Sequence, residues 1–127
     1  MATYFADTAF WIALSRRRDQ YHPRAIAWRS VLWEWLNALA DTTTRSIAAE
    51  GYRRVFTDSR VEVITFDPEL NGAAVDLYRR RIDKDWSLTD CLSFVVMERR
   101  GLIEGLTTDH HFEQAGMKAL MLSLPSL

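Results

Sequence analysis

The chain has 127 residues, enough for one domain with a single core, and its net charge at pH 7 is −1. Hydrophobic residues make up 48% and charged residues 26%, a balance that excludes a disordered tail or a low-complexity polymer. No apolar run approaches the ~20 residues of a membrane span, and the lone Cys91 excludes an internal disulfide, so we expect one cytoplasmic domain over residues 1–127.

The first third of the chain predicts one strand followed by helices. Residues 3–6 form a short apolar β-type run, and residues 9–15 are compatible with a helix. A polar turn is expected at 16–20, and Pro23 suits a helix start. Because neither glycine nor proline interrupts residues 24–40, we expect one helix there.

The remaining elements alternate between helix and strand. Apolar residues near helical spacing predict a helix over 45–57, and β-branched residues over 61–66 predict a strand. Further elements are expected in chain order: helices over 68–78 and 87–100, a strand over 105–108, a short helix over 111–115, and a last strand over 120–122. This alternation predicts an α/β fold with a mainly parallel sheet.

Three aspartates lie where strands end or helices begin. Asp7 and Asp109 each follow a predicted strand, and Asp90 falls in the first turn of the helix over 87–100. Taken singly, each aspartate is better explained as a helix cap, and Ser87 has capping-box spacing to Asp90. In an open parallel sheet, however, these positions line one edge, where ligands bind.

Three carboxylates at one edge require a compensating charge. Two unit charges about 4 Å apart repel by roughly 4 kcal/mol at an effective dielectric near 20. An all-oxygen ligand set suits Mg²⁺ or Mn²⁺, which orients phosphate and activates water in phosphodiester hydrolysis. The sequence therefore predicts a divalent-cation site that acts on phosphodiesters.

The segments around these aspartates resemble the PIN domain family, the Mg²⁺- or Mn²⁺-dependent ribonuclease fold of VapC-type toxins. The resembling segments, residues 5–14, 86–93 and 106–112, match the family's first, third and fourth acidic positions. The resemblance implies a PIN-like three-layer α/β/α fold and an endoribonuclease, the toxin of a bacterial type II toxin–antitoxin pair. It also implies an RNA substrate and a cognate antitoxin protein as partners.

The family's second acid is a glutamate early in the helix that follows the second strand. Glu34 matches this position better than Glu50, which lies one helix further on. The resemblance thus implies a metal-binding and catalytic set of Asp7, Glu34, Asp90 and Asp109. Hydroxyl groups near these carboxylates are expected to orient them by hydrogen bonds: those of Thr8, Ser87 and Thr107.

The unbroken helix over 24–40 departs from the family pattern, because it leaves no room for the second strand. The strand over 61–66 would then pair directly with residues 3–6, and Glu34 would reach the site poorly. A homodimer swapped through the 23–40 helix is the other expected outcome, because short connections favour exchange. The tryptophan-rich surface of this helix fits either core packing or a dimer or antitoxin interface.

Two basic clusters have competing interpretations. Arg79, Arg80 and Arg81 form either a solvated helix face or a contact to RNA phosphates. His110 and His111 are not expected to bind zinc, because adjacent histidines rarely point at one metal ion.

The alternative function is a catalytically degenerate PIN-like protein that acts as a partner-binding or dimerisation module. The missing second strand suggests it, whereas the filled acidic positions argue against it. Metal binding distinguishes the two functions. A receiver-like phosphate-binding protein is a weaker alternative, because Lys118 is poorly placed for it.

Overall fold

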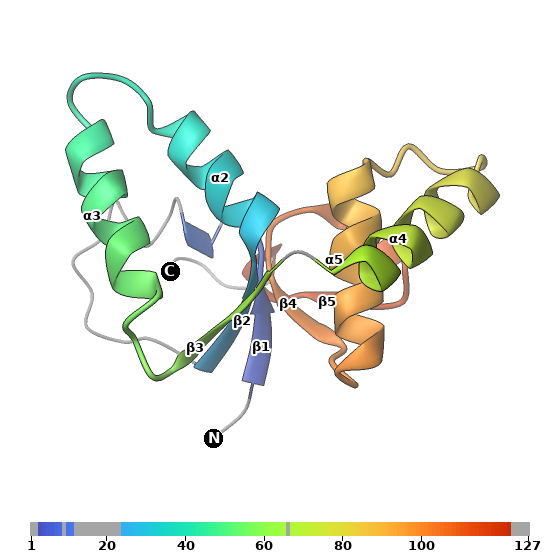
Figure 1. Ribbon diagram of the computed structural model, residues 1–127. Helices are drawn as coiled ribbons and strands as arrows, with labels where there is room; N and C mark the ends of the chain where they lie inside the picture. The colour runs from blue at the N-terminus through green and yellow to red at the C-terminus, as the bar shows by residue number, and fades with distance from the viewer. Residues whose placement is uncertain (1–2, 9, 12–23, 66, 123–127) are drawn as a thin grey trace.

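A parallel β-sheet forms the centre of the computed structural model, which describes residues 3–8, 10–11, 24–65 and 67–122 (Figure 1). Its five strands are β1 (Thr3–Ala6), β2 (Arg24–Trp28), β3 (Val61–Ile64), β4 (Glu104–Leu106) and β5 (Lys118–Ala119). They lie in the order β3-β2-β1-β4-β5, and every pairing is parallel. The predicted α/β class with a mainly parallel sheet is confirmed.

Helices cover both faces of this sheet. The helices are α2 (Arg29–Ala38), α3 (Arg45–Val55), α4 (Pro68–Arg80), α5 (Leu88–Arg99) and α6 (His110–Gln114), followed by the 3₁₀ helix η1 (Leu120–Leu122). Figure 1 shows α2 and α3 on one side of the sheet and α4 and α5 on the other. The molecule therefore has the three-layer arrangement that the sequence predicted.

The second strand, β2, is present, so the prediction of one helix over 24–40 and of a sheet without this strand was wrong. β2 pairs with β1 on one side and with β3 on the other, so β3 does not pair with β1. Helix propensities differ by less than about 0.7 kcal/mol per ordinary residue, whereas β2 gains a hydrogen-bonded neighbour on both sides. Pairing with residues distant in the sequence thus overrides the local preference of residues 24–28 for a helix. A swap through the 23–40 helix loses its basis, because no such continuous helix exists.

The end of the chain also differs from the prediction. Residues 120–122 form η1, and the last strand is β5, which lies two residues earlier. Gly116 has a φ of 88°, a left-handed conformation that favours glycine, and this turn brings Lys118 beside β4. The expected turn at 16–20, the Pro23 helix start and most of the helix over 9–15 lie outside the described residues.

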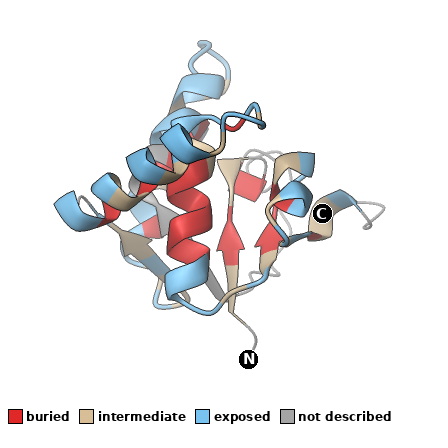
Figure 2. Ribbon diagram, turned by 90° about the vertical axis from the view of Figure 1, so that its right-hand side faces the viewer, coloured by how far each residue is buried: buried red, intermediate tan, exposed pale blue. Residues whose placement is uncertain are grey.

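Helix α5 is the centre of the core. Every residue from Cys91 to Met97 is buried, as Figure 2 shows for this helix. The buried Ser93 hydroxyl donates to the Thr89 carbonyl (2.9 Å), which satisfies the one polar side chain of this stretch. None of the described helices is both long and apolar enough to cross a membrane. The packing of α5 fixes its first turn, which carries Asp90.

The tryptophan-rich helix α2 is mainly a core element. Its buried side chains are those of Val31, Leu32 and Trp35, and the Trp35 ring stacks on Trp11 with centroids 5.7 Å apart. Trp33, in contrast, has 52% of its surface exposed. Core packing therefore accounts for most of the apolar surface of this helix, but not for Trp33.

Gly51 of α3 faces the Trp35 ring at close range. A Cβ atom added at this position would lie 2.8 Å from Trp35 Cη2. The buried, stacked ring cannot move aside freely, so we expect Gly51→Ala to lower the free energy of unfolding by about 1–3 kcal/mol. The matched control is Gly72→Ala in α4, where a Cβ would meet nothing within 4 Å and a gain of about 0.5–1 kcal/mol is expected. Urea denaturation measures both, and equal effects of the two substitutions would contradict this packing.

Candidate metal centre

The carboxyl ends of β1 and β4 form the edge at which the predicted acidic residues meet. β1 leads to β2 on one side, while β4 leads to β5 on the other, so the strand order reverses between them. In open α/β sheets, ligands bind at this reversal. The Asp7 N–H donates to the Leu106 carbonyl (3.2 Å), so the two strands stay paired up to the site.

Thr107 joins Asp7 to Asp109. The fully buried Thr107 hydroxyl donates to Asp7 Oδ2 (2.8 Å) and accepts from the Asp109 N–H (3.0 Å). A single hydroxyl thereby sets the position of a carboxylate on β1 and of the backbone after β4. Threonine can do this because its hydroxyl both donates and accepts.

Asp7 is held in an environment that disfavours its charge. Burial raises the pKa of Asp7 from 3.8 to about 6, and the negative charges of Asp90 and Asp109 add to the rise. The hydrogen bonds from Thr107 and from the Thr8 backbone act in the opposite direction. A cation beside Asp7 would offset the free-energy cost of burying its negative charge and the repulsion by the charges of Asp90 and Asp109.

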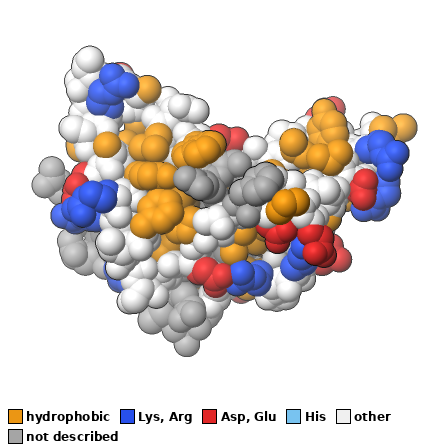
Figure 3. All heavy atoms as spheres, in the orientation of Figure 1, with side chains coloured by type: hydrophobic (Ala, Val, Ile, Leu, Met, Phe, Trp, Pro, Cys, Tyr) orange, Lys and Arg blue, Asp and Glu red, His pale blue; other side chains and the backbone are white. Residues whose placement is uncertain are grey.

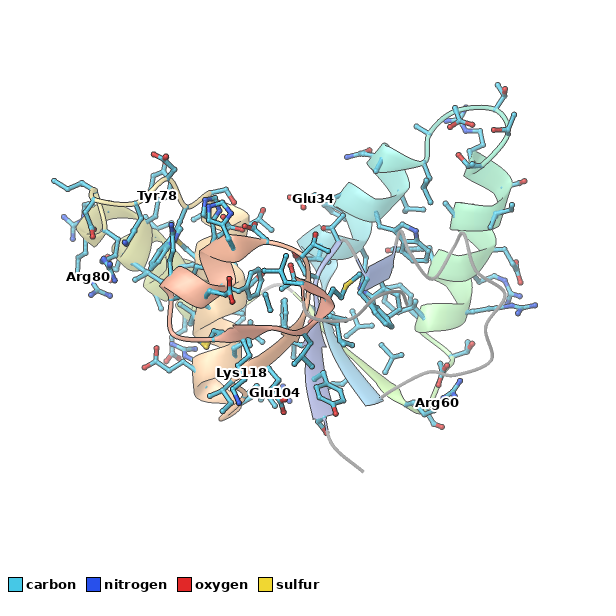
Figure 4. All side chains as sticks on the ribbon, turned by 180° about the vertical axis from the view of Figure 1, so that it is seen from behind. Glu34, Arg60, Tyr78, Arg80, Glu104 and Lys118 are labelled. Carbon is cyan, nitrogen blue, oxygen red and sulfur yellow. The ribbon has the colours of Figure 1, made fainter. Side chains whose placement is uncertain are left out.

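Glu34 reaches the same edge from α2. The Thr8 hydroxyl, next to Asp7 in the chain, donates to Glu34 Oε2 (3.0 Å). Figure 4 shows Glu34 at one end of the sheet, with Glu104 and Lys118 at the other. The other candidate, Glu50, is an exposed residue of α3 bound by Arg53 and Arg54 and is not part of this cluster.

Asp90 is at once a helix cap and a member of the cluster. Asp90 Oδ2 accepts from the Ser87 N–H (3.1 Å), and Ser87 Oγ accepts from the Asp90 N–H (3.0 Å), which completes a capping box. The same Oδ2 atom lies 3.1 Å from His111 Nδ1. The sequence offers a cap and a site as alternatives for Asp90; the structure shows the cap and, on the same oxygen, the contact with His111.

Asp109 and His111 close the cluster. Asp109 caps α6, since its Oδ1 accepts from the His111 N–H (2.9 Å), and His111 Nδ1 lies 3.3 Å from the same oxygen. Possible ligand atoms of Asp109, His110 and His111 all lie within 4.8 Å of one another. Sequence reasoning considered His111 only as a zinc ligand and missed its contact with Asp90. The signal was its place two residues after a capping aspartate, which turns its side chain toward the cap.

These contacts form one continuous chain that runs through all four predicted acids. Its members in order are Glu34, Thr8, Asp7, Thr107, Asp109, His111 and Asp90. Carboxylate oxygens are the ligands that hard divalent cations prefer. This donor set suits such a cation in its chemistry, but among the described residues only the possible ligand atoms of Asp109, His110 and His111 all lie within 4.8 Å of one another.

The three consecutive arginines at the end of α4 lie apart from this cluster. Arg79 pairs with Asp76 (3.7 Å), whereas Arg81 pairs with Asp83 (3.0 Å) and lies over the Trp86 ring. Figure 4 shows Arg80 on the outer side of α4, away from Glu34.

Comparison with known proteins places this chain in a family. No family model matches the chain. The chain is 32% identical over 124 residues to two curated relatives. Both are named 23S rRNA-specific endonuclease VapC20 and come from Mycobacterium tuberculosis, strains CDC 1551 / Oshkosh and H37Rv. Each alignment covers 88% of this chain and 93% of the relative. The crystal structure of Mycobacterium tuberculosis VapC20, described as a Sarcin-Ricin loop cleaving toxin, matches with a TM-score of 0.79 at 22% identity, covering 93% of this chain and 98% of that one, and so shares its fold. The chain therefore belongs to the VapC-type toxin endoribonucleases of the PIN domain family, metal-dependent enzymes that cleave RNA phosphodiester bonds.

Proposed function

We propose that this chain hydrolyses ribosomal RNA with Mg²⁺ or Mn²⁺ held by Asp7, Glu34, Asp90 and Asp109. The observation that carries the proposal is the continuous chain of contacts that brings these four carboxylates to one sheet edge. The relatives at 32% identity are named for cleavage of 23S rRNA, which makes this RNA the first substrate to test. The degenerate alternative is weakened, because the strand whose loss suggested it is present as β2.

Each protein group has a definite task in this proposal. When bound, the cation stabilises charge on the phosphate and makes water more acidic. Thr107 orients Asp7, and Thr8 orients Glu34, which is exposed at the rim where an RNA strand can approach. The nucleophile is a water molecule that attacks phosphorus in line and loses a proton to the solvent, while the P–O bond to the leaving nucleoside breaks and the leaving oxygen takes up a proton from water. Cys91 is not a nucleophile, since it is buried and its pKa is raised by burial.

Exposed groups away from the acids complete the proposal. Arg79 and Arg80 are exposed and available to RNA phosphates, while Arg81 holds the end of α4 through Asp83 and Trp86.

Apolar side chains gather over α2 and α3 and again over α4 (Figure 3). The large exposed ones are Trp33, Ile47 and Phe56 in the first group and Val75, Tyr78 and Ile82 in the second. Two such surfaces suit two protein partners, the cognate antitoxin and a second copy of the chain.

Cleavage of RNA by the purified protein tests the proposed function. We expect 23S rRNA to be cut in the presence of Mn²⁺ or Mg²⁺, and EDTA or Asp90→Asn to stop cleavage. Asp76→Asn, an exposed carboxylate of α4, is the matched control and should cleave at the wild-type rate. Absence of cleavage together with no rise of the melting temperature in millimolar Mn²⁺ would support a binding module instead.

A further inference from the structure

One nitrogen atom of His111 lies between two of the four carboxylates. Nδ1 is 3.1 Å from Asp90 Oδ2 and 3.3 Å from Asp109 Oδ1. The His111 side chain is 22% exposed, and those of Asp90 and Asp109 are 13% and 30% exposed. These two carboxylates come from different elements, α5 and the start of α6, so the imidazole joins two separate parts of the site.

The chemistry of these partners fixes the role of Nδ1. Carboxylate oxygens accept hydrogen bonds, so the tautomer that carries its hydrogen on Nδ1 is the one that can donate to both partners. In the described part of the chain, hydrogen bonds reach Oδ2 of Asp90 and Oδ1 of Asp109, while the second oxygen of each receives none. His111 therefore turns one oxygen of each carboxylate toward itself and leaves the other for a ligand.

The position of His111 is itself well defined. Its backbone N–H donates to Asp109 Oδ1, so the cap that starts α6 also sets the place of the ring. The next residue, Phe112, is fully buried and packs against Phe5 and Phe94, with ring centroids 6.2 and 5.0 Å away. These two contacts tie α6 to β1 and α5, the elements that position Asp7 and Asp90.

We propose that His111 is a positioning residue whose Nδ1–H holds the carboxylates of Asp90 and Asp109 in the arrangement that binds the cation. The proposal rests on the proposed function of this site. The competing role is direct ligation of the cation by Nδ1, which would require this nitrogen to give up its hydrogen and both carboxylate partners.

Two amide substitutions separate these roles. His111→Asn keeps an N–H donor at the position of Nδ1, whereas His111→Gln moves it one bond outward and His111→Leu removes it. Glu113→Gln is the matched control, because this side chain is exposed on the same helix, α6, and the substitution also introduces an amide. Calorimetry with Mn²⁺ on the metal-stripped protein gives the affinity, and RNA cleavage at saturating Mn²⁺ gives kcat. Circular dichroism in EDTA verifies the fold of each variant.

We expect His111→Gln and His111→Leu to bind Mn²⁺ about 10- to 100-fold more weakly, as is typical when a group that orients a ligand is lost. His111→Asn and Glu113→Gln should stay within about threefold of the wild type. Wild-type Mn²⁺ affinity in His111→Leu would overturn the proposal, as would a His111→Asn affinity as low as that of His111→Leu. Failure of the wild type itself to bind Mn²⁺ or to cleave RNA would instead refute the proposed function.

Discussion

Asp7→Asn is expected to abolish RNA cleavage and, in the absence of metal, to make the protein more stable at pH 7. The carboxylate is ionised at this pH although burial raises its pKa to about 6. A shift of this size corresponds to a free-energy cost of about 2–3 kcal/mol at pH 7. Asparagine has the same shape, carries no charge and can still accept the hydrogen bond from Thr107. We expect a gain of about 1–2 kcal/mol in EDTA and a loss of at least about 100-fold in cleavage.

The pH dependence of stability gives this prediction a second readout. Because the folded-state pKa of Asp7 is raised, the folded protein binds this proton more tightly than the unfolded chain does. The stabilisation of the folded protein by this tighter proton binding is complete below about pH 4, and it is lost as the pH rises through 6. Urea denaturation in EDTA should therefore show the wild type losing stability relative to Asp7→Asn between pH 4 and 7, while the Asp76→Asn control follows the wild type. An Asp7→Asn variant less stable than the wild type at pH 7 would contradict the prediction that the buried charge of Asp7 destabilises the folded protein.

Phe112→Ala is expected to cause the largest loss of stability, about 3–5 kcal/mol. The ring is fully buried among Phe5, Phe94 and the backbone at Gly105, where an added Cβ would lie 3.3 Å from Phe112 Cδ2. Its removal leaves a cavity where β1, α5 and α6 meet, next to the cluster of carboxylates.

The matched control for this substitution is Phe56→Ala, whose ring is 48% exposed and contacts Tyr52. We expect it to cost less than about 1 kcal/mol, as is usual for partly exposed side chains. Denaturation midpoints in urea measure both variants. Similar losses of stability in Phe112→Ala and Phe56→Ala would show that Phe112 does not anchor α6.

The sequence predicted those parts of the fold that local patterns determine. The apolar run of residues 91–97 correctly predicted a buried helix, and the Asp67-Pro68 pair correctly marked the start of α4. β2 was missed because no residue in 24–28 breaks a helix, and the pairing that makes it a strand comes from β1 and β3, which are distant in the sequence. The misplaced last strand had a local signal, Gly116, whose positive φ turns the chain.

In the candidate site too, local sequence patterns predicted some features, and the packing of distant segments determined the others. Asp7, Asp90 and Asp109 could be singled out from their places at element ends, and the structure brings them to one sheet edge. The expectation that Glu34 reaches the site poorly depended on the loss of the second strand, whereas β2 is present and ends just before α2 begins. The links through Thr107 and His111 depend on how β4, α5 and α6 pack, which no single segment reveals.

Anomalous scattering from a crystal of the protein grown with Mn²⁺ would show directly whether these carboxylates hold a cation. We expect one or two manganese peaks about 2.0–2.3 Å from carboxylate oxygens of Asp7, Asp90 and Asp109, with Glu34 at the rim of the same site. His111 should remain between Asp90 and Asp109, hydrogen-bonded through Nδ1. Manganese bound elsewhere, or no manganese beside Asp7 in crystals of a protein that cleaves RNA, would contradict a cation site at these carboxylates.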